Sequence, residues 1–136
     1  MTYLVTGAAG HLGHAIIRAL AEKGEDIRAL VLPGEKNIET IAKYAQVYTG
    51  DVRQPDTLIP FFEGTMPRTV IHCAGIVSTA SKYDQTVWDV NAGGTKNVLD
   101  LCKKYAVQKV IQSGESYETS SHHLYRRHHR YDAHGK

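Results

Sequence analysis

The sequence has little cysteine, almost no excess charge and no long hydrophobic run, and each shortage excludes a class of protein. Its 136 residues include two cysteines, Cys73 and Cys102, whose number and spacing fit neither a disulfide scaffold nor a zinc site. No segment approaches the roughly 18 consecutive apolar residues that span a bilayer, and the first residues lack the features of a signal peptide. We therefore expect a cytoplasmic protein with no membrane partner and no metal site.

The charge distribution gives no reason to expect a nucleic-acid partner for the body of the protein. Residues 1–117 contain 12 Lys/Arg and 12 Asp/Glu, whereas residues 118–136 contain 4 and 2 and hold five of the eight histidines. A neutral body has no basic patch with which to attract phosphates. The histidine pairs and arginines of the tail would suit a metal or nucleic acid, but a solvated segment without such a role is the simpler interpretation.

Length and pattern predict one α/β domain. A chain of this size and average apolar content forms a single core. Short β-branched runs alternate with longer helical ones, which is typical of βαβ units around a parallel sheet. The predicted strands are residues 3–6, 27–32, 45–48, 69–72 and 109–112. We therefore expect a Rossmann-type, doubly wound parallel sheet of about five strands.

The segments between these strands carry helical signals. Leu12, Ile16 and Leu20 recur at helical spacing before Gly24, which suits the left-handed end of a helix. We expect helix or loop at 35–44, a helix opening with a proline at 55–62, and one long helix over 84–105. The glycine pair within that long helix suggests close packing against a neighbour.

A glycine motif joins the first predicted strand to the first predicted helix. Gly7 permits the tight turn, Gly10 lets a phosphate approach backbone N–H groups, and Gly13 lets the helix close on the sheet. Glycines in this order, between strand and helix, predict a dinucleotide site, with a structural turn as the alternative.

Four later segments, taken with this motif, make the chain resemble the short-chain dehydrogenase/reductase superfamily. They are Thr49-Gly50-Asp51-Val52-Arg53, Val70-Ile71-His72-Cys73-Ala74-Gly75, Asp89-Val90-Asn91-Ala92-Gly93-Gly94-Thr95-Lys96-Asn97-Val98-Leu99 and Lys109-Val110-Ile111-Gln112-Ser113. The chain is most similar to the extended branch, which comprises NAD(P)-dependent epimerase/dehydratase and dihydroflavonol-reductase-like proteins. The similarity runs from Met1 to about Ser113 and covers only the N-terminal, cofactor-binding half of that branch.

The resemblance implies an NAD(P)-binding domain of an oxidoreductase, epimerase or dehydratase acting on a small molecule. It places the Asp51 segment beside the adenine ring and the Cys73 segment along the adenosine and ribose. The candidate cofactor-binding residues are Gly7, Ala9, Gly10, His11, Leu12, Gly13, Asp51, Val52, Cys73, Ala74, Gly75, Asn91 and Ser113.

The sequence departs from the family at the catalytic residues. The family's chemistry is implied to rest on a Tyr-x-x-x-Lys pair, in which a nearby cation tunes the tyrosine as an acid or base. The match here, Tyr105 and Lys109, spans a helix end and a strand start, at the edge opposite the expected ligand crevice. Gly114 stands where the family has a catalytic serine or threonine, so we predict no catalytic residue in this chain.

Cofactor choice has no clear signature in the sequence. NAD binders carry an acidic residue about 20 residues past the glycine motif, and NADP binders carry an arginine nearby. This chain has Leu32 where similar reductases often have arginine, so Glu35 or Lys36 would have to serve. We favour NADP over NAD.

The composition changes after residue 117, and the expected domains are 1–117 for the cofactor and 118–136 for a disordered or non-native tail. The change suggests a truncated chain or one read in a different frame near Ser113. Loss of later strands would expose the 109–112 edge and the 84–105 helix, so we expect a homodimer through that helix or poor solubility. A non-catalytic dinucleotide-binding module or sensor, and an interaction protein acting through the tail, are the alternative functions.

Overall fold

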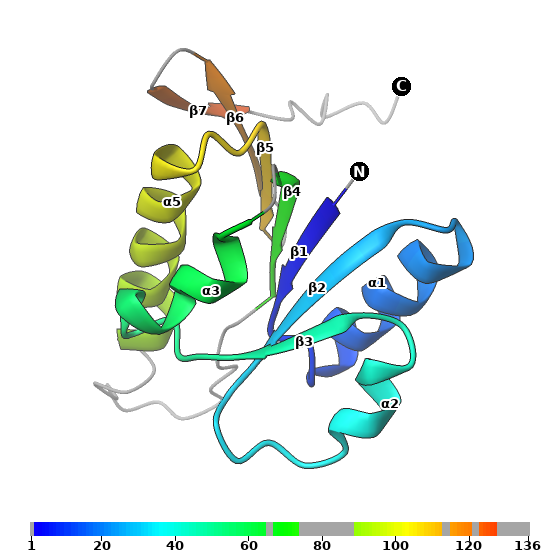
Figure 1. Ribbon diagram of the computed structural model, residues 1–136. Helices are drawn as coiled ribbons and strands as arrows, with labels where there is room; N and C mark the ends of the chain where they lie inside the picture. Colours follow the sequence, from blue (N-terminus) through cyan, green and yellow to red (C-terminus); the bar gives the residue numbers. More distant parts are fainter. Residues whose placement is uncertain (1, 65–66, 74–88, 113–114, 121–122, 128–136) are drawn as a thin grey trace, which may run out of the picture.

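One mixed sheet organises the molecule, for which we use a computed structural model that describes residues 2–64, 67–73, 89–112, 115–120 and 123–127. The strands lie in the order β3-β2-β1-β4-β5-β6-β7 (Figure 1). Their bounds are β1 (Thr2–Thr6), β2 (Asp26–Val31), β3 (Gln46–Thr49), β4 (Pro67–His72), β5 (Lys109–Gln112), β6 (Glu115–Ser120) and β7 (His123–Arg127).

The first five strands confirm the predicted doubly wound sheet. They are mutually parallel, and the order 3-2-1-4-5 places a topological switch point between β1 and β4. Each lies within two residues of its predicted bounds. The prediction succeeded because β-branched runs buried on both faces of a sheet stand out clearly from the polar segments that separate them.

Two apolar clusters, one on each face of the sheet, hold the helices in place. Consecutive residues of one strand enter opposite clusters: Leu4 packs beneath the α3 and α5 side, and Val5 packs beneath the α1 and α2 side. Figure 1 shows the two helical layers on either side of the strands. The helical bounds are α1 (His11–Glu22), α2 (Ile38–Ala42), the 3₁₀ turn η1 (Pro55–Leu58), α3 (Ile59–Phe62), the π-turn η2 (Asp89–Gly93) and α5 (Gly94–Lys104).

The helix predictions hold for most of the chain. Gly24 follows α1 in the predicted left-handed conformation, with φ +76°, and Pro55 opens η1 as expected. Residues 35–44 form only the short helix α2, preceded by Asn37 in a left-handed conformation. In the described part of the chain, no helix combines the length and the apolar composition needed to cross a membrane.

The predicted helix over 84–105 is confirmed for residues 89–104, but its first described turn is π-helical and not α-helical. A π-turn, η2, comes before α5, and the helix becomes regular only at Gly94. Gly94 is buried, as the packing argument expected, whereas a Cβ on Gly93 would meet nothing within 4 Å. The Thr95 hydroxyl donates to the Asn91 carbonyl at 2.6 Å within this turn, an interaction that periodicity does not reveal.

The expected disorder after residue 117 is corrected for residues 118–120 and 123–127, which form strands. β6 pairs antiparallel with β5, and β7 pairs antiparallel with β6, so the expected boundary at residues 117/118 falls inside β6. The expectation of disorder rested on the inability of this segment to fill a core. A hairpin on a sheet edge needs mainly free backbone N–H and C=O groups, which β5 supplies, and residues compatible with strands.

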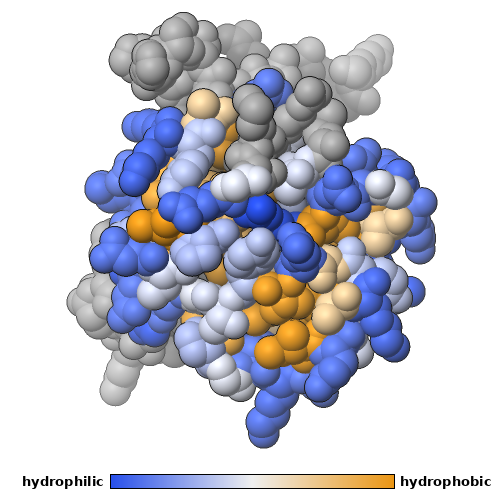
Figure 2. Space-filling view, in the orientation of Figure 1, coloured by the Kyte–Doolittle hydropathy of each residue, from blue (hydrophilic) through white to orange (hydrophobic). Residues whose placement is uncertain are grey.

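The expected dimer rested on an exposed 109–112 edge and an exposed 84–105 helix, and neither premise holds in the described residues. β5 is an interior strand, because β6 covers its edge. The apolar stripe of α5 packs inward through Val98, Leu101 and Cys102, while Lys96 and Lys103 on its outer face are exposed. Figure 2 shows a mostly hydrophilic face in which apolar groups form separate patches.

Candidate functional site

The turn between β1 and α1 has the geometry that its glycines predict. Gly7 adopts a left-handed conformation, with φ +65°, directly after the strand. The Ala8 amide then donates to the Leu30 carbonyl of β2 at 3.2 Å, and the Gly10 amide donates back to the Gly7 carbonyl at 3.1 Å. The turn is therefore tied to the sheet at the carboxyl ends of the strands, where open α/β sheets bind ligands.

Gly13 brings α1 into direct contact with this turn. A Cβ built on Gly13 would lie 2.2 Å from the Gly7 carbonyl oxygen and 2.9 Å from its carbon. No other residue type fits at this position without moving the backbone. The steric role that the sequence assigned to Gly13 is thus present in the structure.

The first turn of α1 offers backbone donors to a ligand. The first intrahelical bond runs from the His14 amide to the Gly10 carbonyl at 3.0 Å, so the amides of His11, Leu12 and Gly13 lie ahead of it. No side chain caps this end of the helix, and its first turn has no acidic residue. Donors at the positive end of a helix dipole suit a diphosphate.

A cavity of about 480 Å³ opens beside this turn, between α1 and the β2–α2 connection. His11 and His14 line it from the helix, and Glu35, Lys36 and Asn37 line it from the connection. His14 Nε2 is buried and has no hydrogen-bond partner among the described residues. The cavity therefore places mixed polar groups next to the glycine turn.

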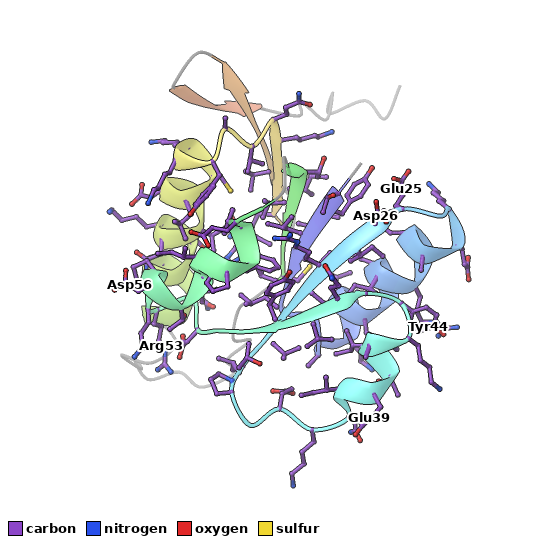
Figure 3. All side chains as sticks on the ribbon, viewed as in Figure 1. Glu25, Asp26, Glu39, Tyr44, Arg53 and Asp56 are labelled. Atoms are coloured by element: carbon purple, nitrogen blue, oxygen red, sulfur yellow. The ribbon has the colours of Figure 1, made fainter. Side chains whose placement is uncertain are left out.

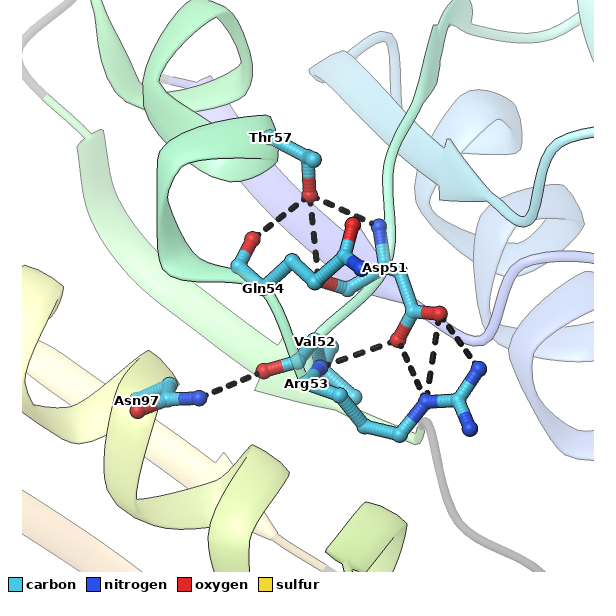
Figure 4. A network of polar contacts seen from close by, with 6 residues as sticks. All are labelled: Asp51, Val52, Arg53, Gln54, Thr57 and Asn97. Carbon is cyan, nitrogen blue, oxygen red and sulfur yellow. Dashed lines mark hydrogen bonds and ion pairs between the residues drawn. The ribbon is translucent and has the colours of Figure 1, made fainter.

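The segment after β3 is held by a compact hydrogen-bond network (Figure 4). The Asp51 amide donates to Thr57 Oγ1 at 2.9 Å, and this hydroxyl lies 3.0 Å from the Asp51 carbonyl. The Asp51 carboxylate accepts from the Arg53 guanidinium, with a contact of 2.7 Å to Nη2. The Arg53 hydrogen bonds hold the pKa of Asp51 below its usual value.

Asn97 is a site residue that the sequence reasoning missed. Its side-chain amide donates from α5 to the Val52 carbonyl at 2.9 Å, so it holds the segment of two candidate residues, Asp51 and Val52, against the helix (Figure 4). Asn97 lies 45 residues from Val52 in the chain. The sequence signal that could have identified it is a polar residue beside the buried Val98 of α5, at a position that is itself partly buried.

Of the remaining candidates, the structure describes Cys73 and Asn91. Cys73 follows β4 at the same edge of the sheet and is half-buried, and burial raises the pKa of its thiol. Asn91 lies in η2 and is exposed. Ala74, Gly75 and Ser113 lie outside the described residues.

Tyr105 and Lys109 lie far from this edge. Tyr105 caps the end of α5 with its ring stacked on Phe62 at 5.5 Å, and Lys109 is the first residue of β5. Both belong to the amino edge of the parallel strands, the edge that Glu25 and Asp26 mark in Figure 3, whereas Arg53 marks the other. The glycine turn, the Asp51 segment, Cys73 and Asn91 gather at the carboxyl edge without this pair.

Comparison with known proteins agrees with this arrangement. The chain is 31% identical over 113 residues to sterol demethylase protein B of Methylococcus capsulatus and 29% identical over 119 residues to UDP-glucose 4-epimerase of Streptomyces lividans. These matches cover 83% and 82% of the chain, but 34% and 35% of those proteins. The chain therefore spans about a third of the length of these relatives.

A solved structure and a family model give the same result. The UDP-glucose 4-epimerase of Thermus thermophilus, solved in complex with NAD, matches 81% of this chain and 36% of its own, with a TM-score of 0.72 and 28% identity. The model of the NAD dependent epimerase/dehydratase family matches residues 3–130, well past Ser113, where we expected the similarity to end. The parallel sheet, the glycine turn at its switch point and this match show that the chain belongs to the NAD dependent epimerase/dehydratase family, as its nucleotide-binding domain.

Proposed function

We propose that the chain binds a nicotinamide dinucleotide, with the diphosphate on the amides of the first turn of α1. The observation that carries this proposal is the contact between Gly13 and the Gly7 carbonyl. It brings a helix N-terminus without a side-chain cap to the switch point of the sheet.

The other candidate residues would bind the rest of the cofactor from the same edge. The Asp51–Val52 segment would border the adenine, while Cys73, Ala74 and Gly75 would line the adenosine and ribose. Asn91 and Ser113 are the remaining candidate contacts with the cofactor. The cofactor supplies hydride chemistry when it is bound, and these residues orient it.

We base the choice between NADP and NAD on the groups that line the cavity beside the turn. Lys36 and the imidazoles of His11 and His14 outnumber the one carboxylate, Glu35. This balance favours a ribose that carries a 2′-phosphate, so we propose that NADP binds more tightly than NAD.

Titration of the chain with NADH and NADPH, followed by nicotinamide fluorescence, tests the binding proposal. Gly10→Ala should weaken both by about tenfold or more, because its methyl group would stand where the phosphates approach the backbone. Gly10 has backbone angles that alanine adopts, but its Cβ would lie 3.3 Å from the Gly7 carbonyl oxygen, so urea denaturation of Gly10→Ala should accompany the titration to show that the turn keeps its stability. Gly24→Ala, at the other end of α1, serves as the control and should leave both affinities unchanged. Absence of NADH and NADPH binding by the unmodified chain would refute the proposal.

Two further variants test the cofactor preference. Lys36→Ala should weaken NADPH and leave NADH nearly unchanged, whereas Glu35→Ala should weaken NADH alone. Lys103→Ala, exposed on α5, is the matched control for loss of a surface lysine. Equal affinity for both dinucleotides, unchanged in Lys36→Ala, would contradict the preference.

We further propose that this chain binds cofactor without catalysing the family's reaction by itself. Tyr105 and Lys109 lie at the wrong edge, and none of Tyr117, Tyr125 and Tyr131 is followed by lysine four residues later. An oxidoreductase, epimerase or dehydratase acting on a small molecule would then need residues beyond those described. Turnover of UDP-glucose or of a reduced nicotinamide with a carbonyl substrate by this chain would contradict the proposal of a binding module.

Of the proposed partners, a second copy of this chain bound through residues 84–105 has the least support, because β6 covers the β5 edge and the apolar stripe of α5 packs inward. Light scattering of the chain decides the question. A dimer that dissociates on Lys96→Glu would support association through α5, and a monodisperse monomer would contradict it.

A further inference from the structure

A buried histidine links the central strands of the site to the first turn of α5. His72 is the last residue of β4 and is 4% exposed. Its Nδ1 lies 2.7 Å from Thr6 Oγ1 at the end of β1, and its Nε2 lies 3.1 Å from Thr95 Oγ1 in α5. The dinucleotide contacts proposed above make no use of this imidazole.

The direction of the hydrogen bonds on Thr95 identifies the protonated ring nitrogen. Thr95 Oγ1 lies 2.6 Å from the Asn91 carbonyl, which has no proton to give, so the single hydroxyl proton lies on that contact. Toward His72, Thr95 can therefore only accept, and His72 Nε2 carries a proton. The Gln112 amide donates to the same oxygen at 3.3 Å, which fills the second acceptor position.

The other ring nitrogen faces a hydroxyl that already accepts a bond. Thr6 Oγ1 accepts from the Cys73 amide at 3.0 Å, and a ring that is 4% exposed and carries its one proton on Nε2 leaves Nδ1 to accept the Thr6 hydroxyl proton. In this arrangement the imidazole is neutral, with Nδ1 as acceptor and Nε2 as donor. Burial lowers the pKa of His72 to about 4, in agreement with a neutral ring near pH 7.

The hydrogen bonds around His72 extend to two segments that carry candidate cofactor-binding residues. Through Thr6 they reach the Cys73 amide, and through Thr95 they reach the carbonyl of Asn91 in the π-turn. These two candidates stand 18 residues apart in the sequence and belong to different segments of the fold. A single imidazole therefore connects them through hydrogen bonds.

We propose that His72 is a positioning residue of the dinucleotide site: a neutral Nε2–H imidazole that sets the Cys73 segment and the Asn91 turn relative to each other. The inference rests on the proposed binding of a dinucleotide. His72 acts through Thr6 and Thr95, without touching the cofactor itself.

The tautomer can be measured without any ligand. In the nitrogen-15 spectrum of the full chain at pH 7, His72 should show a pyridine-type Nδ1 and a pyrrole-type Nε2. In Thr95→Val, which removes the acceptor, this fixed tautomer should be lost, and Thr95→Ser should restore it. A protonated ring, or the opposite tautomer, in the unmodified chain would overturn the proposal.

Affinity for NADH tests the positioning role. Thr95→Val should raise the dissociation constant about tenfold, whereas Thr95→Ser should stay within about twofold of the unmodified chain. Thr69→Val is the matched control, since it makes the same change at a buried position of β4 at the opposite edge. It should leave the affinity unchanged. His72→Gln, which keeps a donor near Nε2, should weaken NADH less than His72→Ala.

The outcomes separate this inference from the proposed function. If the unmodified chain binds NADH and Thr95→Val binds it equally well, the positioning role is refuted while the dinucleotide site stands. If the unmodified chain binds neither NADH nor NADPH, the proposed function fails and the positioning role fails with it. Loss of affinity in Thr95→Val, with rescue by serine and the expected tautomer, supports both.

Discussion

Gly13→Ala is the most demanding test of the glycine turn. The added Cβ would lie 2.2 Å from the Gly7 oxygen, 2.9 Å from the Gly7 carbon and 3.1 Å from Ala8 Cα. All three atoms belong to the backbone and cannot rotate away. Non-bonded carbon and oxygen atoms stay more than about 3 Å apart, so α1 must move by roughly 1 Å.

The expected cost can be estimated from this shift. Overpacking in a tight interior costs about 1–3 kcal/mol, and the higher helix propensity of alanine returns at most about 1 kcal/mol. We therefore expect the free energy of unfolding to fall by about 2 kcal/mol. The first-turn amides move with the helix, so the affinity for NADH and NADPH should fall by at least about tenfold.

The measurement combines urea denaturation with the dinucleotide titration, and Gly24→Ala is the reference. Gly24 has φ +76° and nothing within 4 Å of an added Cβ, so alanine there costs about 1–2 kcal/mol through its backbone conformation alone. Gly24→Ala should therefore lose stability but keep dinucleotide affinity. Unchanged stability and unchanged affinity in Gly13→Ala would refute the steric argument.

Two further predictions concern stability. Burial lowers the pKa of His72 from 6.5 to about 4 in the folded protein. As the pH falls below 6.5, the unfolded chain therefore binds a proton that the folded protein does not, and the free energy of unfolding decreases. We expect a loss of about 3 kcal/mol between pH 6.5 and pH 4, and no effect of His72 above pH 6.5. Urea denaturation across this range should show the loss, and His72→Gln should abolish the dependence in that window. Arg28→Met should lower the unfolding free energy by about 1 kcal/mol, because the Arg28 guanidinium donates to the Phe61 and Glu63 carbonyls at the end of α3 and lies over the Tyr48 ring at 5.1 Å. Thermal denaturation of Arg28→Met beside Arg18→Met, at an exposed position of α1, checks this, and equal melting temperatures would contradict it.

Several features of the molecule could be predicted from local sequence. The five parallel strands follow from short β-branched runs, and the glycine turn follows from the order of Gly7, Gly10 and Gly13 between a strand and a helix. The left-handed conformation of Gly24 at the end of α1 also follows from local sequence. Each depends on residues close together in the chain, whose steric preferences act whatever the rest of the protein does.

Other features depended on partners that the sequence does not bring together. The π-turn before α5 depends on Thr95 and on its neighbours in β4 and β5, so helical periodicity misses it. The β6–β7 hairpin depends on the edge that β5 offers, which composition does not report. Composition alone therefore predicted disorder where the structure has strands.

By itself, then, the sequence determined the βαβ order and the turn for the diphosphate, because hydrophobic pattern and glycine sterics act over a few residues. Only the tertiary structure decided that Asn97 would hold Val52 from 45 residues away and that His72 would join Thr6 and Thr95 from 66 and 23 residues away. Hydrogen bonds of this kind form only after the sheet has brought the ends of its strands to one edge. Their geometry is therefore a product of the fold and leaves no local pattern in the chain.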